Sequence, residues 1–180
     1  MKVENELSPA GRNWLQAFAD DEHIIGCRHA AWIGLGPFLE EDLAFCSIAQ
    51  DELGHAIALY EFLTDDVDAH ALLRAPEDQR SCWLVELPCD DWDQALVRHW
   101  LYDRAEQLRW QALADSSVPE LALLAARAER DESFHRDHAE LFLRRLCEGD
   151  QHGRDRIRNT IVDLLPVATA LWDPVEGEAD

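Results

Sequence analysis

The sequence predicts an all-α fold: a four-helix bundle with a long crossover between its two halves and an extra C-terminal helix. Apolar residues recur at helical spacing in five long segments, at residues 11–33, 38–63, 92–115, 119–147 and 152–172. Breaks of a few residues follow the first and the third segment, and short breaks between long helices imply antiparallel hairpins. No strand-rich region competes with this helical pattern.

The first hairpin is predicted by two neighbouring segments. The periodicity of residues 11–33 stops at the stretch GLGP, residues 34–37, because glycine and proline interrupt helices. Residues 38–63 then contain no breaker except Gly54. The two helices should therefore run antiparallel across a tight connection.

The crossover is predicted for residues 64–90, where TDDVDAH and APEDQ carry turn and capping residues. This segment is long enough to lead from one hairpin to the next. In the second hairpin, DSSVP separates residues 92–115 from residues 119–147. The later helix begins with Pro119 and Glu120, which are residue types that helix starts prefer.

The C-terminal helix, residues 152–172, contains Pro166, where we expect a kink. The tail at residues 173–180 should be loose. Hairpin, crossover and hairpin is the connection order of a ferritin-like bundle. The helical blocks need no linker, so we expect residues 1–180 to form a single domain.

The composition narrows the class of protein. The net charge is −21, from 37 acidic and 16 basic residues, which argues against nucleic acid and anionic membrane surfaces as partners. No apolar run reaches the roughly 18 residues that span a bilayer. The N-terminus lacks an apolar signal core, and the five cysteines form no CxxC pair. We therefore expect a cytoplasmic protein with reduced, mostly buried thiols.

The spacing Glu-x-x-His occurs twice, as Glu52/His55 and as Glu132/His135, in the second helix of each predicted hairpin. Residues three apart lie on one helix face, about 5–6 Å apart at Cβ, so both side chains can bind one metal ion. A single copy is typical of an ordinary helix surface. Two copies in corresponding helices predict a dimetal carboxylate site, in which the other two helices each supply one carboxylate.

The carboxylate of the first helix is sought among neighbouring polar residues, Asp20, Asp21, Glu22 and His23. Glu22 precedes Glu52 by 30 residues. With a rise of about 1.5 Å per residue, this separation places the two at similar heights across a tight hairpin.

The carboxylate of the third long helix is either Asp103 or Glu106. Asp103 precedes Glu132 by 29 residues, close to the separation in the first hairpin, and Glu106 precedes it by 26. The matched separation favours Asp103 and leaves Glu106 open.

Several residues are candidates for supporting positions around the metal. Asp51 and Asp131 each precede a proposed glutamate ligand. Such an aspartate can accept the outer N–H of a ligand histidine across the bundle, or it can lie on a solvated helix face. His138, three residues after His135, and Glu106 are further candidates for this outer layer.

The stretches EHIIGCRHAAW, EEDLAFCSIAQDELGHA, WLVELP, HWLYDRAEQL and ERDESFH resemble the phenylacetic acid catabolic family, the ferritin-like subunits of the bacterial multicomponent phenylacetyl-CoA oxygenase (epoxidase). The resemblance covers roughly residues 15–172. QDELGH and DESFH are similar to metal-binding motifs of the catalytic subunit. PFLEEDLAF, WLVELP and ALWDPVE are more similar to its partner subunit.

The resemblance to the catalytic subunit implies a six-residue ligand set, with an aspartate on the third helix. These positions are Glu22, Glu52, His55, Asp103, Glu132 and His135. It also implies a cofactor of two iron ions, with manganese or zinc as other possible occupants.

We therefore expect a di-iron oxygenase-type protein, a monooxygenase related to phenylacetyl-CoA epoxidation in aromatic catabolism. It would act on a small-molecule or acyl-CoA substrate and associate with itself or with a related subunit. The sequence has no flavin or iron–sulfur motif, so electrons would come from a separate reductase. The alternatives are a non-catalytic structural subunit of such a complex and a ferritin-type metal oxidase or storage protein.

Overall fold

A computed structural model of the chain describes residues 7–173, and every regular element in this range is a helix. The long helices are α1 (Pro9–Ala30), α2 (Leu39–Tyr60), α5 (Trp92–Ala114), α6 (Pro119–Glu148) and α7 (Gln151–Thr169). Their ends lie within three residues of the predicted ends. The predicted all-α, ferritin-like bundle is confirmed.

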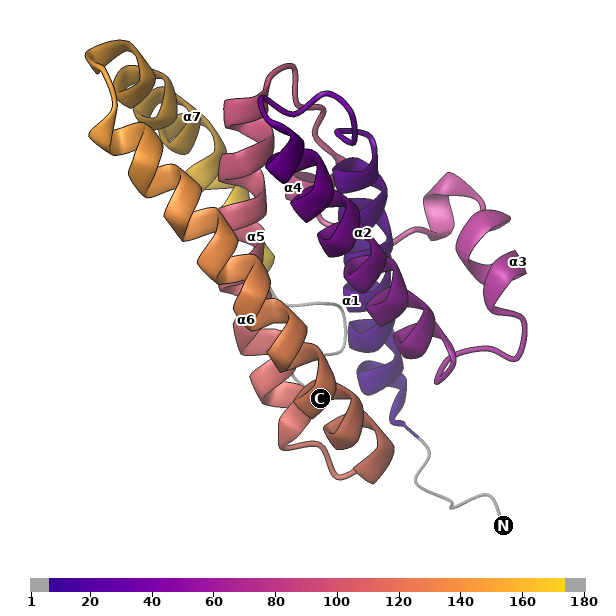
Figure 1. Cartoon of the computed structure of the whole chain (residues 1–180). Coiled ribbons are helices and arrows are strands. Elements are labelled where there is room, and N and C mark those ends of the chain that lie inside the picture. Colours follow the sequence, from indigo (N-terminus) through magenta and orange to yellow (C-terminus); the bar gives the residue numbers. More distant parts are fainter. Residues whose placement is uncertain (1–6, 174–180) are drawn as a thin grey trace.

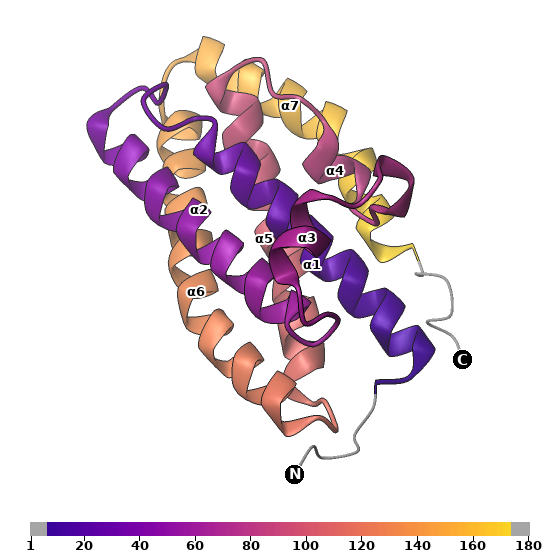
Figure 2. The ribbon, with the colours of Figure 1, turned by 90° about the vertical axis from the view of Figure 1, so that its right-hand side faces the viewer.

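The crossover contains only short helices: α3 (Val67–Leu72), the 3-10 helix η1 (Pro76–Asp78) and α4 (Trp83–Glu86). It runs along one side of the bundle and returns to the end at which α2 begins (Figure 2). Consequently α2 and α5 run in the same direction (Figure 1). The antiparallel partner of α2 is α1, and the antiparallel partner of α5 is α6.

The bundle consists of two well-packed hairpins. α1 packs mainly on α2, and α5 packs mainly on α6. α7 lies against α5 and α6, continues through Pro166 and leads into the 3-10 helix η2 (Ala170–Trp172). Of the tail expected at residues 173–180, all but residue 173 lies outside the described residues. Within the described helices, none is both long and apolar enough to cross a membrane.

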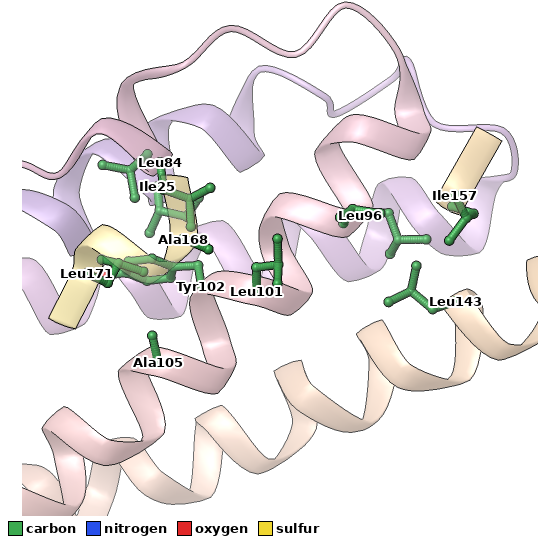
Figure 3. Close-up of a cluster of buried hydrophobic side chains, with 12 residues drawn as sticks. Ile25, Leu84, Leu96, Leu101, Tyr102, Ala105, Leu143, Ile157, Ala168 and Leu171 are labelled. Carbon is green, nitrogen blue, oxygen red and sulfur yellow. The ribbon is translucent and has the colours of Figure 1, made fainter. Parts of the chain in front are cut away.

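Two apolar clusters hold the helices together. One fills the end of the bundle where α1 begins and α2 ends, and it includes Phe18, Leu59, Trp110 and Leu121. The other joins α4 and α7 to α5 through residues such as Leu84, Leu96, Tyr102, Ile157 and Leu171 (Figure 3). The stretch of core between α1, α2, α5 and α6 that neither cluster fills is therefore available to polar side chains.

The cysteine prediction is partly wrong. All five cysteines are free thiols, but Cys27 and Cys147 are exposed and the other three are only half-buried. Cys27 of α1 and Cys147 of α6 are not among the buried residues of their helices.

The crossover is fastened to the bundle by two buried aspartates of α1. Asp20 accepts hydrogen bonds from the Tyr60 hydroxyl at 2.6 Å and the Arg80 backbone amide at 2.8 Å, and it forms a two-pronged ion pair with the Arg74 guanidinium. Asp21 accepts the Cys82 backbone amide at 2.6 Å. Asp21 also pairs with Arg109 of α5 at 2.6 Å, so the oxygens of both aspartates are held by partners outside the metal site.

Replacing Arg74 by methionine should destabilise the protein by about 2–3 kcal/mol. The buried Asp20 would lose its charged partner, and such a loss costs about 3–5 kcal/mol when nothing else compensates. The bonds from Tyr60 and from the Arg80 amide remain and reduce the cost. Urea denaturation followed by circular dichroism would measure the difference. Arg80→Ala is the matched control, since its backbone bond to Asp20 survives; equal destabilisation by both variants would contradict the assignment.

Candidate metal centre

Five buried side chains from all four bundle helices converge on one point. Glu22 comes from α1, Glu52 and His55 from α2, Glu106 from α5, and Glu132 from α6. Each offers one ligand atom, and these atoms all lie within 4.8 Å of one another. The group lies at mid-height in the bundle, next to the apolar cluster that contains Phe18 and Trp110.

His135 of α6 joins this group. Its Nδ1 lies 3.5 Å from Glu52 Oε1 and 3.4 Å from Glu132 Oε1. His55 mirrors this arrangement, because its Nδ1 lies 3.4 Å from both Glu22 Oε2 and Glu132 Oε1. Both imidazoles therefore present Nδ1 to the carboxylates and keep Nε2 for a partner outside the group.

The outer nitrogens are met by two aspartates in a crossed pattern. His135 Nε2 of α6 lies 3.3 Å from Asp51 Oδ2 of α2, and His55 Nε2 of α2 lies 3.6 Å from Asp131 Oδ2 of α6. An aspartate in this position orients the ring and favours the tautomer whose Nδ1 is free to bind a metal. Each Asp-Glu-x-x-His segment thus supplies ligand candidates and places an aspartate beside the histidine of the other segment. Asp51 hydrogen-bonds His135, whereas Asp131 makes only an ion-pair contact with His55.

The four glutamates fall into two pairs by their hydrogen bonding. Glu22 Oε1 accepts the Tyr102 hydroxyl at 2.7 Å, and Glu106 Oε1 accepts the Trp110 indole N–H. Their other oxygens are buried without a hydrogen-bond partner. For Glu52 and Glu132, both oxygens are buried and free of hydrogen bonds. The sequence pattern gave no sign of the tyrosine and tryptophan donors, because neither residue belongs to a metal-binding motif.

Close helix packing brings α1 and α2 to the group. Gly26, one turn after Glu22, faces α2, and a Cβ added there would lie 2.9 Å from Leu53 Cγ and 3.1 Å from Glu52 Cβ. Any larger residue at this position would push α2, and Glu52 with it, away from α1.

The structure places Glu106 in the group and Asp103 outside it, which differs from the expected ligand set. Glu22 lies eight residues before the end of α1, and Glu52 lies thirteen after the start of α2. Glu106 lies eight residues before the end of α5, and Glu132 lies thirteen after the start of α6. The depth along each helix is what matches. The total separations differ because the first connection, residues 31–38, is longer than the second, residues 115–118.

Asp103 and His138 lie one level further along the core. Asp103 Oδ1 is 3.1 Å from His99 Nδ1, and His138 Nε2 is 3.2 Å from Glu41 Oε2. His138 therefore pairs with Glu41, whereas the sequence offered it as a candidate for the layer around the metal. Burial lowers the pKa of His99 well below its usual value, so this ring is neutral at pH 7.

The crowding of carboxylates shifts their proton affinities. Burial raises the pKa of Glu52, and the charges of Glu22 and Glu132 raise it further. Burial and the same two neighbours raise the pKa of Glu106. Burial alone would lower the pKa of His55, but contacts with Glu132 and Glu22 outweigh it and raise the pKa to about 11. The site thus attracts positive charge strongly.

These side chains fit a metal pair. Free carboxylate oxygens and Nδ1 atoms are buried at one point without hydrogen-bond partners, and buried polar atoms left so are costly. Four carboxylates and two imidazoles form a donor set that suits iron, manganese or zinc, with no soft thiolate among them. Two divalent cations would balance the four negative charges.

The sequence also matches known proteins. Residues 2–180 match the profile that describes phenylacetic acid catabolic proteins. The chain belongs to this family. A relative from Escherichia coli (strain K12), described as one of the subunits of 1,2-phenylacetyl-CoA epoxidase, is 26% identical to it over 158 residues. The aligned part covers 85% of this chain and 64% of the relative, so the chain spans less than two thirds of that relative's length.

The two candidate ligands on α5 of this family member can be told apart by substitution. Glu106→Gln should lower the affinity for Mn²⁺ by about 100-fold or more. Loss of a residue that only supports a ligand lowers metal affinity by up to about 100-fold, and loss of a ligand should cost at least as much. Asp103→Asn should change it by less than about threefold, because Asp103 lies outside the group. Titration followed by electron paramagnetic resonance would measure both affinities. The reverse order would restore Asp103 as the ligand.

Proposed function

We propose that this protein is a di-iron carboxylate protein of the oxygenase type, acting on an acyl-CoA thioester of an aromatic acid. The observation that carries the proposal is the buried group of four glutamates and two histidines with unpaired donor atoms turned inward. Family membership and the epoxidase component among its relatives support the substrate class.

The free oxygens suggest a role for each glutamate. Glu52 and Glu132 have two free oxygens each, so each could offer both to bound metal. Glu22 and Glu106 have one free oxygen each, because Tyr102 and Trp110 hold the other, so each would offer one. Each histidine would add its Nδ1.

A bound pair of Fe²⁺ ions would supply the redox chemistry that activates O₂ for insertion into the substrate. The chain itself keeps the site dry and fixed. Phe18 and Trp110 pack 4.7 Å apart between ring centroids beside the ligands, and His55 lies 5.2 Å from Trp110. Two electrons must come from a separate reductase, since none of the chain's motifs holds a flavin or an iron–sulfur cluster.

A second candidate function is a structural subunit that supports a catalytic partner of the same fold. The similarity to a protein described as one component of a multi-subunit epoxidase favours it, as do the partner-like stretches in the sequence. The complete donor group opposes it, because a purely structural subunit has no need of buried, unpaired carboxylates. A ferritin-type metal oxidase would share the same donor group and differ only in its lack of an organic substrate.

The test is anaerobic loading with Fe²⁺, followed by metal analysis and O₂ uptake with a reductase and phenylacetyl-CoA. We expect two Fe per chain and O₂ consumption that depends on both the reductase and the thioester. Glu132→Gln should abolish both. Glu129→Gln lies one helical turn earlier and keeps an oxygen for its partner Arg136, outside the donor group, so it should preserve both.

Three other results separate the alternatives. Less than one metal ion per chain in the wild type would sink the metal proposal. Two ions with thioester-independent O₂ uptake would favour a ferritin-type oxidase. Full activity of a complex that contains the Glu132→Gln chain would favour the structural role.

Metal affinity should rise with pH between pH 6 and pH 8. The pKa of His55 is about 11 without metal, so its ring carries a proton throughout this range, and a metal ion must displace that proton. The raised pKa of Glu52 and Glu106 acts in the same direction. Affinity should increase by about tenfold per pH unit for each proton released. Calorimetry of Mn²⁺ binding in buffers of different ionisation enthalpy counts the protons, and a count of zero would contradict this prediction.

A further inference from the structure

The two halves of the bundle core differ in polarity on either side of the metal centre. Toward the end where α1 begins, the core is the apolar cluster with Phe18, Leu59, Trp110 and Leu121. Toward the other end, all four bundle helices contribute buried polar side chains. They are His29 from α1, Glu41 from α2, His99 and Asp103 from α5, and His138 from α6.

Four of these residues form a continuous series, which we call the polar ladder: Glu41, His138, His99 and Asp103. Glu41 Oε2 lies 3.2 Å from His138 Nε2, and Asp103 Oδ1 lies 3.1 Å from His99 Nδ1. The rings of His138 and His99 are 5.7 Å apart, and those of His99 and His135 are 6.3 Å apart. The ladder therefore ends at a histidine of the metal centre.

Every residue of the polar ladder has an oxygen or nitrogen atom that could bind a metal ion and makes no hydrogen bond. Glu41 Oε1, His138 Nδ1, His99 Nε2 and Asp103 Oδ2 are buried without a hydrogen bond. All four side chains are at least nine-tenths buried. Buried polar atoms without a hydrogen bond indicate that a polar or cationic species binds beside them. The potential metal ligands of the ladder come in pairs, and the only group of three or more in the described part of the chain is the metal centre. Two ligands bind a cation more weakly than five or six do, so an ion could move on from each pair.

The outer end of the ladder opens on a cavity. A surface cavity of about 550 Å³ lies between the start of α2 and the end of α6 and is lined by Phe38, Glu40, Glu41, Phe142, Arg145 and Leu146. Glu41 belongs both to this cavity and to the ladder. A net charge of −21 on the chain raises the local concentration of cations at such a surface.

We propose that the polar ladder is the route by which divalent metal ions enter the metal centre from this cavity. An ion would pass from Glu41 and His138 to His99 and Asp103 and then to Glu132 and His135. The opposite end offers no such series of unpaired atoms. Its core cluster is apolar, and its buried carboxylates, Asp20 and Asp21, are already held by Arg74 and Arg109. The inference rests on the metal binding proposed above.

The test follows the rate of metal uptake. Stopped-flow absorption with Co²⁺ would compare the wild type with Glu41→Gln and His138→Gln. Each variant should take up Co²⁺ about tenfold more slowly, the effect of one lost charged or ligating contact on the barrier. Glu120→Gln is the matched control, since Glu120 is likewise a first-turn glutamate but is exposed at the far end of α6.

The rate of release distinguishes a route from a structural role. Excess EDTA added to the loaded protein should release Co²⁺ from Glu41→Gln and His138→Gln more slowly by the same factor, with equilibrium affinity and final spectrum unchanged. A distorted metal centre would instead weaken affinity and alter the spectrum.

Two outcomes would overturn the route: uptake by both variants at the rate of Glu120→Gln, or slower uptake with a matching loss of affinity. If the wild type bound no Co²⁺ at all, the proposed function itself would fail. The two failures are thus distinguishable.

Discussion

The structure depends on the enforced proximity of four carboxylates in a buried core. Glu22, Glu52, Glu106 and Glu132 approach one another closely enough to repel, and burial adds to the cost of their charge. Protonated histidines and raised carboxyl pKa values offset part of this cost, and two divalent cations would offset it more fully. Tyr102 and Trp110, although they belong to the hydrophobic core, each fix one oxygen of a glutamate. The packing around the site thus also determines which donor atoms face inward.

The sequence predicted the helices and both Glu-x-x-His pairs because these depend on local periodicity. It predicted Glu22 because a tight hairpin keeps residues at equal depth. It favoured Asp103 over Glu106 because the comparison used total separation, which adds the length of the connection to the depth along each helix. The Asp20–Arg74 ion pair and the polar ladder depend on contacts between distant segments. Such contacts leave no periodic signal in a single sequence.

The core divides its tasks along the bundle axis. The half with Phe18 and Trp110 provides apolar packing, which stabilises the fold and covers one side of the candidate metal centre. The half with His99 and His138 gives up apolar burial for donor atoms that have no structural partner. A protein gains nothing in stability from such atoms, so their presence points to a function in moving or holding a polar species.

The crossed aspartates have a consequence for how the two hairpins are joined. Asp51 hydrogen-bonds the histidine of α6, and Asp131 lies within ion-pair distance of the histidine of α2. α2 and α6 contact each other much less than either contacts its own hairpin partner. A sliding movement of one hairpin along the other by a single residue would separate both aspartate–histidine pairs at once. The relative register of the two hairpins is therefore held by reciprocal polar contacts at the centre. An ion bound there would hold the same register, because its ligands come from both hairpins.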